Sequence, residues 1–251
     1  MRVKMASGLP LLVVILTNSA VGGPSFRLVP IERHALGSGI ELEDRAEGKV
    51  VAFYDEDGTI IKEIPYTDAC NGPVVSRNKK NVVTREPVGT CDIMAEYRLK
   101  LYDVQGSLVA TSEPLMLYDL HVQPLGNNST VLVIYPAVDG PEFVITILQV
   151  EGDTLSTVST IQEERGDPWL DVGLDGQHWV IAAHASPAVD KAEVVLLGSD
   201  GAVIWRVALD ESTFRGPLLI SPRSRYVLAC SADFDAHHGY AYLLSIDGQR
   251  L

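Results

Sequence analysis

The chain has 251 residues, of which 46% are hydrophobic and 21% are charged, and its formal net charge is −13 at pH 7. This composition excludes a disordered chain and allows a substantial core, formed by one large all-β domain or by two smaller domains. The negative charge argues against nucleic acid and against anionic lipid as main partners.

The amino terminus has the three-part pattern of a signal peptide. Arg2 and Lys4 precede the apolar run "LPLLVVIL" at 9–16, and the small and polar residues "TNSAVGG" follow. The pattern predicts a signal peptide over 1–22 and a mature chain over 23–251 that is secreted or periplasmic. The apolar run is too short to span a bilayer, and no later run is longer, so we expect no membrane span after signal removal.

The rest of the chain repeats with a period of about 47 residues. "VVLLGSDG" at 194–201 returns as "AYLLSIDG" at 241–248, and "WVIAA" at 179–183 returns as "YVLAC" at 226–230. Glycines in polar turns extend the register at positions 58, 106, 152, 201 and 248. Self-similarity of this period is typical of propellers and related repeat folds. It predicts units near 26–66, 72–113, 118–162, 166–210 and 216–251.

Each unit contains four runs rich in Val, Ile, Leu and Tyr, bounded by Gly, Pro, Asp and Ser, as β-strands are. The predicted fold class is therefore all-β, a β-propeller-like array of about five antiparallel four-stranded repeats. The last copy ends at "DGQRL", before a fourth strand. Either this unit is three-stranded, or a segment such as "FRLVPIER" at 26–33 completes it, or the chain is part of a larger ring.

Two short motifs resemble known propeller repeats. "LLGSDGAVIWRV" is similar to the repeat of PQQ-type quinoprotein propellers, and "ISPRSRYVLACS" resembles a strand pair of WD40-like secreted propellers. The resemblance implies the fold rather than an activity, because a fold does not bring function with it. Only Trp205 occupies the tryptophan position of the quinoprotein repeat, the chain has no adjacent cysteines, and five copies are fewer than eight blades. We therefore expect no PQQ and predict no other organic cofactor.

The three cysteines are too few for a disulfide scaffold and lack the CxxC spacing of a zinc or redox site. In an oxidising compartment we expect a disulfide between Cys70 and Cys91. Cys230 lies in the apolar run "YVLAC" and is interpreted as a small core residue.

Acidic residues recur in the loops predicted to join the second and third strands, which should emerge on one face. The candidate ligand-binding residues are Asp92, Asp139, His184 and Asp190. Asp and Pro are also ordinary turn residues, so a duplicated repeat would copy the "PAVD" of 136–139 and 187–190 without a functional reason.

The densest group of polar residues is "DFDAHHG" at 233–239. Asp233, Asp235 and His237 offer oxygen and imidazole ligands for a divalent cation such as calcium. His237 and His238 depart from the calcium-loop pattern, and the alternative is a solvated polar loop.

The sequence contains no GxSxG, HExxH or P-loop motif, so no local motif indicates a particular reaction. The leading hypothesis is a secreted or periplasmic module that binds a protein or a small polar or cationic ligand. The alternatives are an extracellular hydrolase or lyase whose Asp and His residues converge on one face, and a partial propeller without a separate activity.

Overall fold

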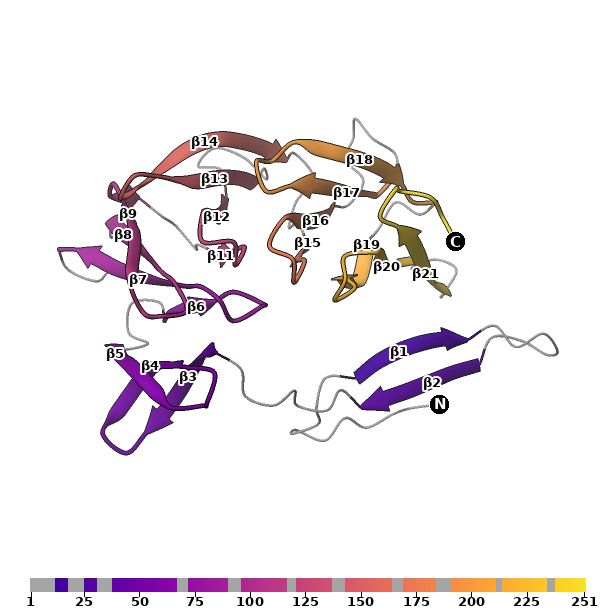
Figure 1. The fold of residues 1–251 in the computed structure, drawn as a ribbon. Coiled ribbons are helices and arrows are strands. Elements are labelled where there is room, and N and C mark those ends of the chain that lie inside the picture. The colour runs from indigo at the N-terminus through magenta and orange to yellow at the C-terminus, as the bar shows by residue number, and fades with distance from the viewer. Residues whose placement is uncertain are drawn as a thin grey trace.

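A computed structural model describes the backbone of residues 12–17 and 25–30 and the ranges 38–66, 72–89, 96–116, 121–136, 143–163, 169–183, 191–210, 214–233 and 238–251. All regular elements in these ranges are strands, so the predicted all-β class is confirmed. The strands form five successive groups, here called blades 1 to 5, which follow one another along an arc (Figure 1). A separate hairpin, β1–β2, lies on the open side of this arc.

The strands of the hairpin and of the first two blades have the following bounds. The hairpin contains β1 (Leu12–Thr17) and β2 (Ser25–Pro30). Blade 1 contains β3 (Gly39–Arg45), β4 (Gly48–Tyr54) and β5 (Ile60–Tyr66). Blade 2 contains β6 (Val74–Val75), β7 (Val82–Val88), β8 (Glu96–Tyr102) and β9 (Leu108–Ser112), and β10 (Leu115–Met116) also pairs with β8.

The remaining blades continue in the same order. Blade 3 contains β11 (His121–Pro124), β12 (Thr130–Pro136), β13 (Phe143–Glu151) and β14 (Thr154–Glu163). Blade 4 contains β15 (Trp169–Val172), β16 (His178–Ala183), β17 (Glu193–Gly198) and β18 (Val203–Ala208). Blade 5 contains β19 (Phe214–Ile220), β20 (Tyr226–Asp233) and β21 (His238–Ser245).

Neighbouring strands within a blade pair antiparallel, in chain order. One parallel contact joins two blades, because β14 pairs with β9 at Thr154↔Thr111 and Leu155↔Ser112. Blades 2 and 3 therefore share one continuous sheet. The two blades are held at this point by backbone pairing as well as by side-chain packing.

The hydrophobic core lies between the blades. On β12 the buried Val131 and Val133 belong to a cluster shared with blade 2, whereas the buried Leu132 and Ile134 belong to a cluster shared with blade 4. Both faces of this strand are thus buried, which explains its continuous apolar run "TVLVIYP". Full burial of an aliphatic side chain of this size contributes roughly 1.5–3 kcal/mol, so stacking of the blades supplies most of the stability.

Blade 1 has three described strands where four were predicted, and blade 5, whose fourth strand the sequence left open, also has three. β2 lies about one repeat period before β6, yet it pairs with β1 in the register Leu12↔Pro30 to Thr17↔Ser25. In blade 5 the last residues begin a fourth strand: Arg250 forms a bridge with Leu244, and the Leu251 N–H donates to the Leu243 carbonyl at 2.9 Å.

In blades 4 and 5 the glycine of the turn between the third and fourth strands packs against the preceding blade. Gly201 has φ +82°, and a Cβ there would lie 2.1 Å from Cδ1 of Ile147 in blade 3. Gly248 has φ +79°, and its Cβ would lie 2.9 Å from Cγ of Trp205 in blade 4. Both positions require glycine for two reasons, the left-handed backbone and the close approach of the preceding blade.

Gly201→Ala is therefore expected to destabilise the protein more than Gly152→Ala. Gly152 also has a positive φ, but no atom lies within 4 Å of the position of its Cβ, so alanine costs about 1 kcal/mol of backbone strain. At Gly201 the clash with Ile147 adds about 1–3 kcal/mol. Urea denaturation of the two variants measures the difference, and equal losses would show that Gly201 does not seal the blade.

Candidate functional site

Most residues predicted for a site lie outside the described part of the chain. These are Asp92, Asp139, His184, Asp190, Asp235, His237, Cys70 and Cys91. Asp233 is the last residue of β20, opposite His238 in the register of β21. Among the described residues, no group of three or more His, Cys, Asp or Glu side chains is placed to hold a metal ion. The ligand-face, metal and disulfide assignments therefore stay predictions.

The strand directions give the blades two different faces. Second strands end on one face, at Val88, Pro136, Ala183 and Asp233, where the connections to the third strands begin. We call this the long-loop face. The opposite face, the short-turn face, carries the tight turns between first and second strands, which span 76–81, 125–130, 173–178 and 221–226.

Side chains on the short-turn face connect turns of different blades. Asn78 of blade 2 donates from Nδ2 to the Gly126 carbonyl of blade 3 at 3.0 Å and to the Leu174 carbonyl of blade 4 at 3.2 Å. Asn81 donates to Asn128 Oδ1 at 2.7 Å and accepts from the Asn128 N–H at 3.0 Å. These bonds connect three blades. They also provide hydrogen-bond partners for polar groups of the turns, which lose contact with water where the blades pack together.

An ion pair lies beneath these turns, between the inner strands. Arg77 Nη1 is 2.5 Å from Asp171 Oδ2 on β15 and donates to the Val172 carbonyl at 2.9 Å. The same Asp171 oxygen accepts the Ile220 N–H of β19 at 2.6 Å. One carboxylate of blade 4 thus contacts its neighbour, blade 5, and also blade 2, which is not its neighbour along the chain.

Burial changes the pKa of this carboxylate. The Asp171 side chain is 16% exposed, and its desolvation raises its pKa above the usual 3.8, although the Ile220 N–H and Arg77 act in the opposite direction. A raised pKa means that the folded chain holds the proton more readily than the unfolded chain. The resulting stability is present at acid pH and is lost as the pH rises through the raised pKa.

Asp171→Ala is expected to lower the free energy of unfolding by about 3 kcal/mol at neutral pH, because Arg77 loses its carboxylate partner and the Ile220 N–H loses its acceptor. Asp171→Asn keeps an oxygen acceptor and should lose less. As the pH rises through the raised pKa of Asp171, the wild-type chain should lose stability relative to Asp171→Asn.

Urea denaturation over this pH range measures both effects. Asp44→Ala is the matched control, since its side chain is 78% exposed, and it should change stability by less than about 0.5 kcal/mol. An Asp171→Ala variant as stable as this control would show that the carboxylate does not hold the blades together.

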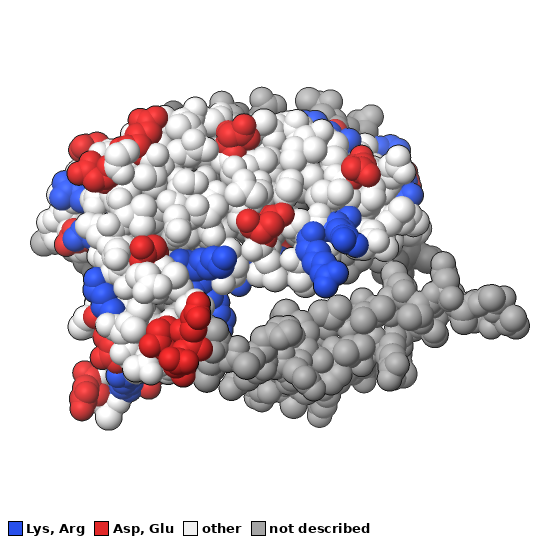
Figure 2. All heavy atoms as spheres, in the orientation of Figure 1, with Lys and Arg blue, Asp and Glu red and all other residues white. Residues whose placement is uncertain are grey.

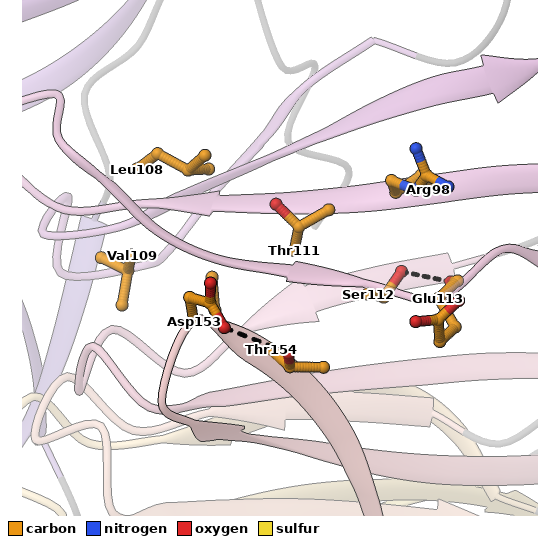
Figure 3. A pocket seen from close by; sticks show the side chains of 9 residues that line it. Arg98, Leu108, Val109, Thr111, Ser112, Glu113, Asp153 and Thr154 are labelled. Carbon is orange, nitrogen blue, oxygen red and sulfur yellow. Dashed lines mark hydrogen bonds between the residues drawn. The ribbon is translucent and has the colours of Figure 1, made fainter.

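A cavity of about 330 Å³ opens on the outer side of the seam between blades 2 and 3 (Figure 3). Its lining combines one guanidinium, two carboxylates and three hydroxyls with small apolar groups, and is formed by Arg98, Leu108, Val109, Ala110, Thr111, Ser112, Glu113, Asp153 and Thr154. At its edge the Thr111 N–H donates to the Asp153 carbonyl at 2.9 Å. We call this cavity the seam cavity.

The identity of residue 110 explains why this seam is open. Ala110 pairs with Leu101 at the last position before a bulge, and Lys62 and Trp205 hold the same register positions in blades 1 and 4. Trp205 fills its seam and donates from Nε1 to the Ile246 carbonyl at 2.6 Å, and Lys62 donates to the Gly106 carbonyl. The side chain of Ala110 is a single methyl group, which is too small to fill the seam between blades 2 and 3.

Sequence reasoning did not find either group of residues. An aspartate within the apolar strand "WLDV" was the one available signal for Asp171, because a charged residue in a buried strand needs a partner. Arg98 stands in the alternating strand "EYRLKLY". This pattern is the same whether the side chain faces water or a cavity, so the sequence held no signal for the seam cavity.

Neither a protein-family model nor a curated protein matches the chain. Solved structures with a similar fold include the β-propeller domain of the trilobed protease from Pyrococcus furiosus, with a TM-score of 0.51 at 10% identity, covering 82% of this chain and 64% of that one. The fold is a β-propeller. The described residues contain no helix long and apolar enough to cross a membrane.

Two whole enzymes share the propeller fold over a smaller part of their length. The acylaminoacyl peptidase of Pyrococcus horikoshii gives a TM-score of 0.50 at 11% identity, covering 84% of this chain and 36% of that one. Prolyl oligopeptidase B of Galerina marginata gives a TM-score of 0.50 at 13% identity, covering 84% of this chain and 31% of that one. The chain therefore spans about a third of these enzymes, and at this identity the likeness concerns the fold alone.

Proposed function

We propose that this propeller is a secreted or periplasmic binding module that contacts a protein or a small polar or cationic ligand through its long-loop face. The observation that carries the proposal is the difference between the two faces. Asn78, Asn81 and Arg77 lock the turns of the short-turn face to one another. A scaffold fixed on one face can present variable loops on the other, which is how loops on rigid folds carry binding functions.

Charge favours a cationic ligand. The chain carries 33 acidic and 20 basic residues, and Figure 2 shows acidic side chains on blade 1 and over the outer strands, separated by wide uncharged areas. The proposed loop ligands Asp139, Asp190, Asp233 and Asp235 would add to this negative potential. A local negative potential raises the concentration of cations and speeds their binding.

Millimolar calcium is expected to raise the melting temperature of the mature protein. A cation that binds the native state alone stabilises it in proportion to its affinity and concentration. Asp233→Ala combined with Asp235→Ala should abolish the rise, because both proposed carboxylate ligands are removed. Differential scanning calorimetry measures the shift.

A matched control replaces two exposed acidic residues of blade 1, Glu56 and Asp57, by alanine and should leave the calcium effect intact. The proposal of a cation at this loop fails if the wild-type melting curve is the same with calcium and with excess chelator. Loss of the calcium effect in the control alone would place the cation on blade 1 instead.

Export can be tested separately from binding. If residues 1–22 form a signal peptide, the protein recovered from the extracytoplasmic compartment should begin near Val21 or Gly23, because only there do small residues follow the apolar run. Cleavage would remove β1 from the mature chain. Intact-mass spectrometry measures the terminus, and exported protein that retains Met1 would contradict the expectation.

A further inference from the structure

The lining of the seam cavity carries charges of both signs. In the described part of the chain, no side-chain hydrogen bond or ion pair engages the Arg98 guanidinium, although Arg45, Arg77 and Arg250 have carboxylate partners. Arg98 stands opposite Glu86 of β7, but the Glu86 carboxylate is paired with Lys100 at 2.8 Å. The free guanidinium is a ready partner for a carboxylate.

The two carboxylates of the cavity lie on different sides of it. Figure 3 shows Glu113 on the same side as Arg98, Asp153 beside Thr154 on the other side, and Thr111 between Arg98 and Asp153. Within the described part of the chain, Asp153 Oδ1 accepts one long hydrogen bond, of 3.4 Å, from Thr154 Oγ1. Its carboxylate can therefore accept further hydrogen bonds from an ammonium group.

We propose that the seam cavity binds a small zwitterion of the amino acid or short peptide class. The ligand carboxylate pairs with Arg98, its ammonium group pairs with Asp153, and the threonine hydroxyls bond the polar groups between them. The volume of about 330 Å³ is sufficient for a molecule of dipeptide size. This site lies at the outer strands and is independent of the binding proposed for the long-loop face.

Net charge selects this class over an acidic sugar, which has a carboxylate and hydroxyls as well. The lining holds two carboxylates, Glu113 and Asp153, against the single guanidinium of Arg98. A ligand with a net negative charge would meet repulsion from the lining and from the whole chain, whose net charge is −13. A ligand with both charges gains the Arg98 contact without this penalty.

The proposal is tested with glycylglycine as the probe. Its N-acetylated form lacks the ammonium group, its C-amidated form lacks the carboxylate, and glucose is a neutral polyol. Nuclear magnetic resonance titration should show saturable shifts at the backbone amides of Thr111, Ser112 and Thr154. We expect a Kd on the order of 1 mM, because the ligand is small and its ion pairs are partly exposed.

Variants separate the two charged contacts. Arg98→Gln should weaken the binding of glycylglycine at least about fivefold and should not weaken the binding of the amidated form, because that form has no carboxylate to pair with Arg98. Asp153→Asn should weaken glycylglycine and the amidated form but not the acetylated form. The controls are Arg223→Gln and Asp247→Asn, which are exposed on turns of blade 5 and should bind as the wild type does.

A third variant fills the cavity. Ala110→Trp should abolish binding by occupying the space as Trp205 occupies the seam between blades 4 and 5. Ala110 is 1% exposed, so this substitution can also disturb folding. If the Ala110→Trp variant does not fold, the Arg98 and Asp153 variants test the site without it.

Several outcomes overturn the proposal. They are the absence of saturable shifts, shifts confined to amides outside the seam, equal binding of the parent and both blocked dipeptides, and an unchanged affinity in Arg98→Gln. Tighter binding of glucose than of glycylglycine would identify a neutral polyol site instead and would also overturn it. None of these results bears on the calcium effect, so failure here is distinguishable from failure of the binding role proposed for the long-loop face.

Discussion

The structure depends on one constraint, which is that each central blade must bury both faces of its sheet. Blade 3 has no core of its own: Val131 and Val133 pack toward blade 2, and Leu132 and Ile134 pack toward blade 4. Consecutive residues of a strand thus contribute to different cores. This arrangement explains the nearly unbroken apolar runs of β12 and β17, which would be poorly soluble in a sheet with one face in water.

Polar contacts then fix how the stacked blades are oriented. Hydrophobic packing is non-directional and would tolerate some sliding of one sheet on another. Hydrogen bonds have preferred distances and angles, so the contacts of Asn78 and of Asp171 allow little sliding. A buried carboxylate at the centre is costly, and its raised pKa reflects that cost. The benefit is that one oxygen atom sets the relative position of β15 and β19.

Much of the fold was predictable from the sequence, because strands and turns leave local signals. The spacing of Gly106, Gly201 and Gly248 indicated the repeat, and the positive φ of these residues explains why glycine recurs there. Pairing of β2 with β1 was not predictable, since the repeat period alone does not say which edge a first strand joins.

The candidate sites were less predictable, because they arise between blades. Arg77 and Asp171 are far apart in sequence, and no local pattern connects a turn residue of one blade with a strand residue of another. The seam cavity results from the small size of Ala110, and alanine in a strand has no feature that distinguishes a filled seam from an open one. The loops that carried the sequence-based site predictions lie outside the described residues.

The sharing of cores between neighbours also has a consequence for unfolding. If one blade opened alone, it would expose its own apolar faces and also the faces of the two blades beside it. Partial unfolding from the middle is therefore costlier than fraying from either end, where blade 1 and blade 5 each have a single neighbour in the arc. Stability in such an array behaves as a sum of nearest-neighbour terms. Hydrogen exchange should accordingly be slowest in the backbone amides of blade 3 and fastest at the two ends of the arc.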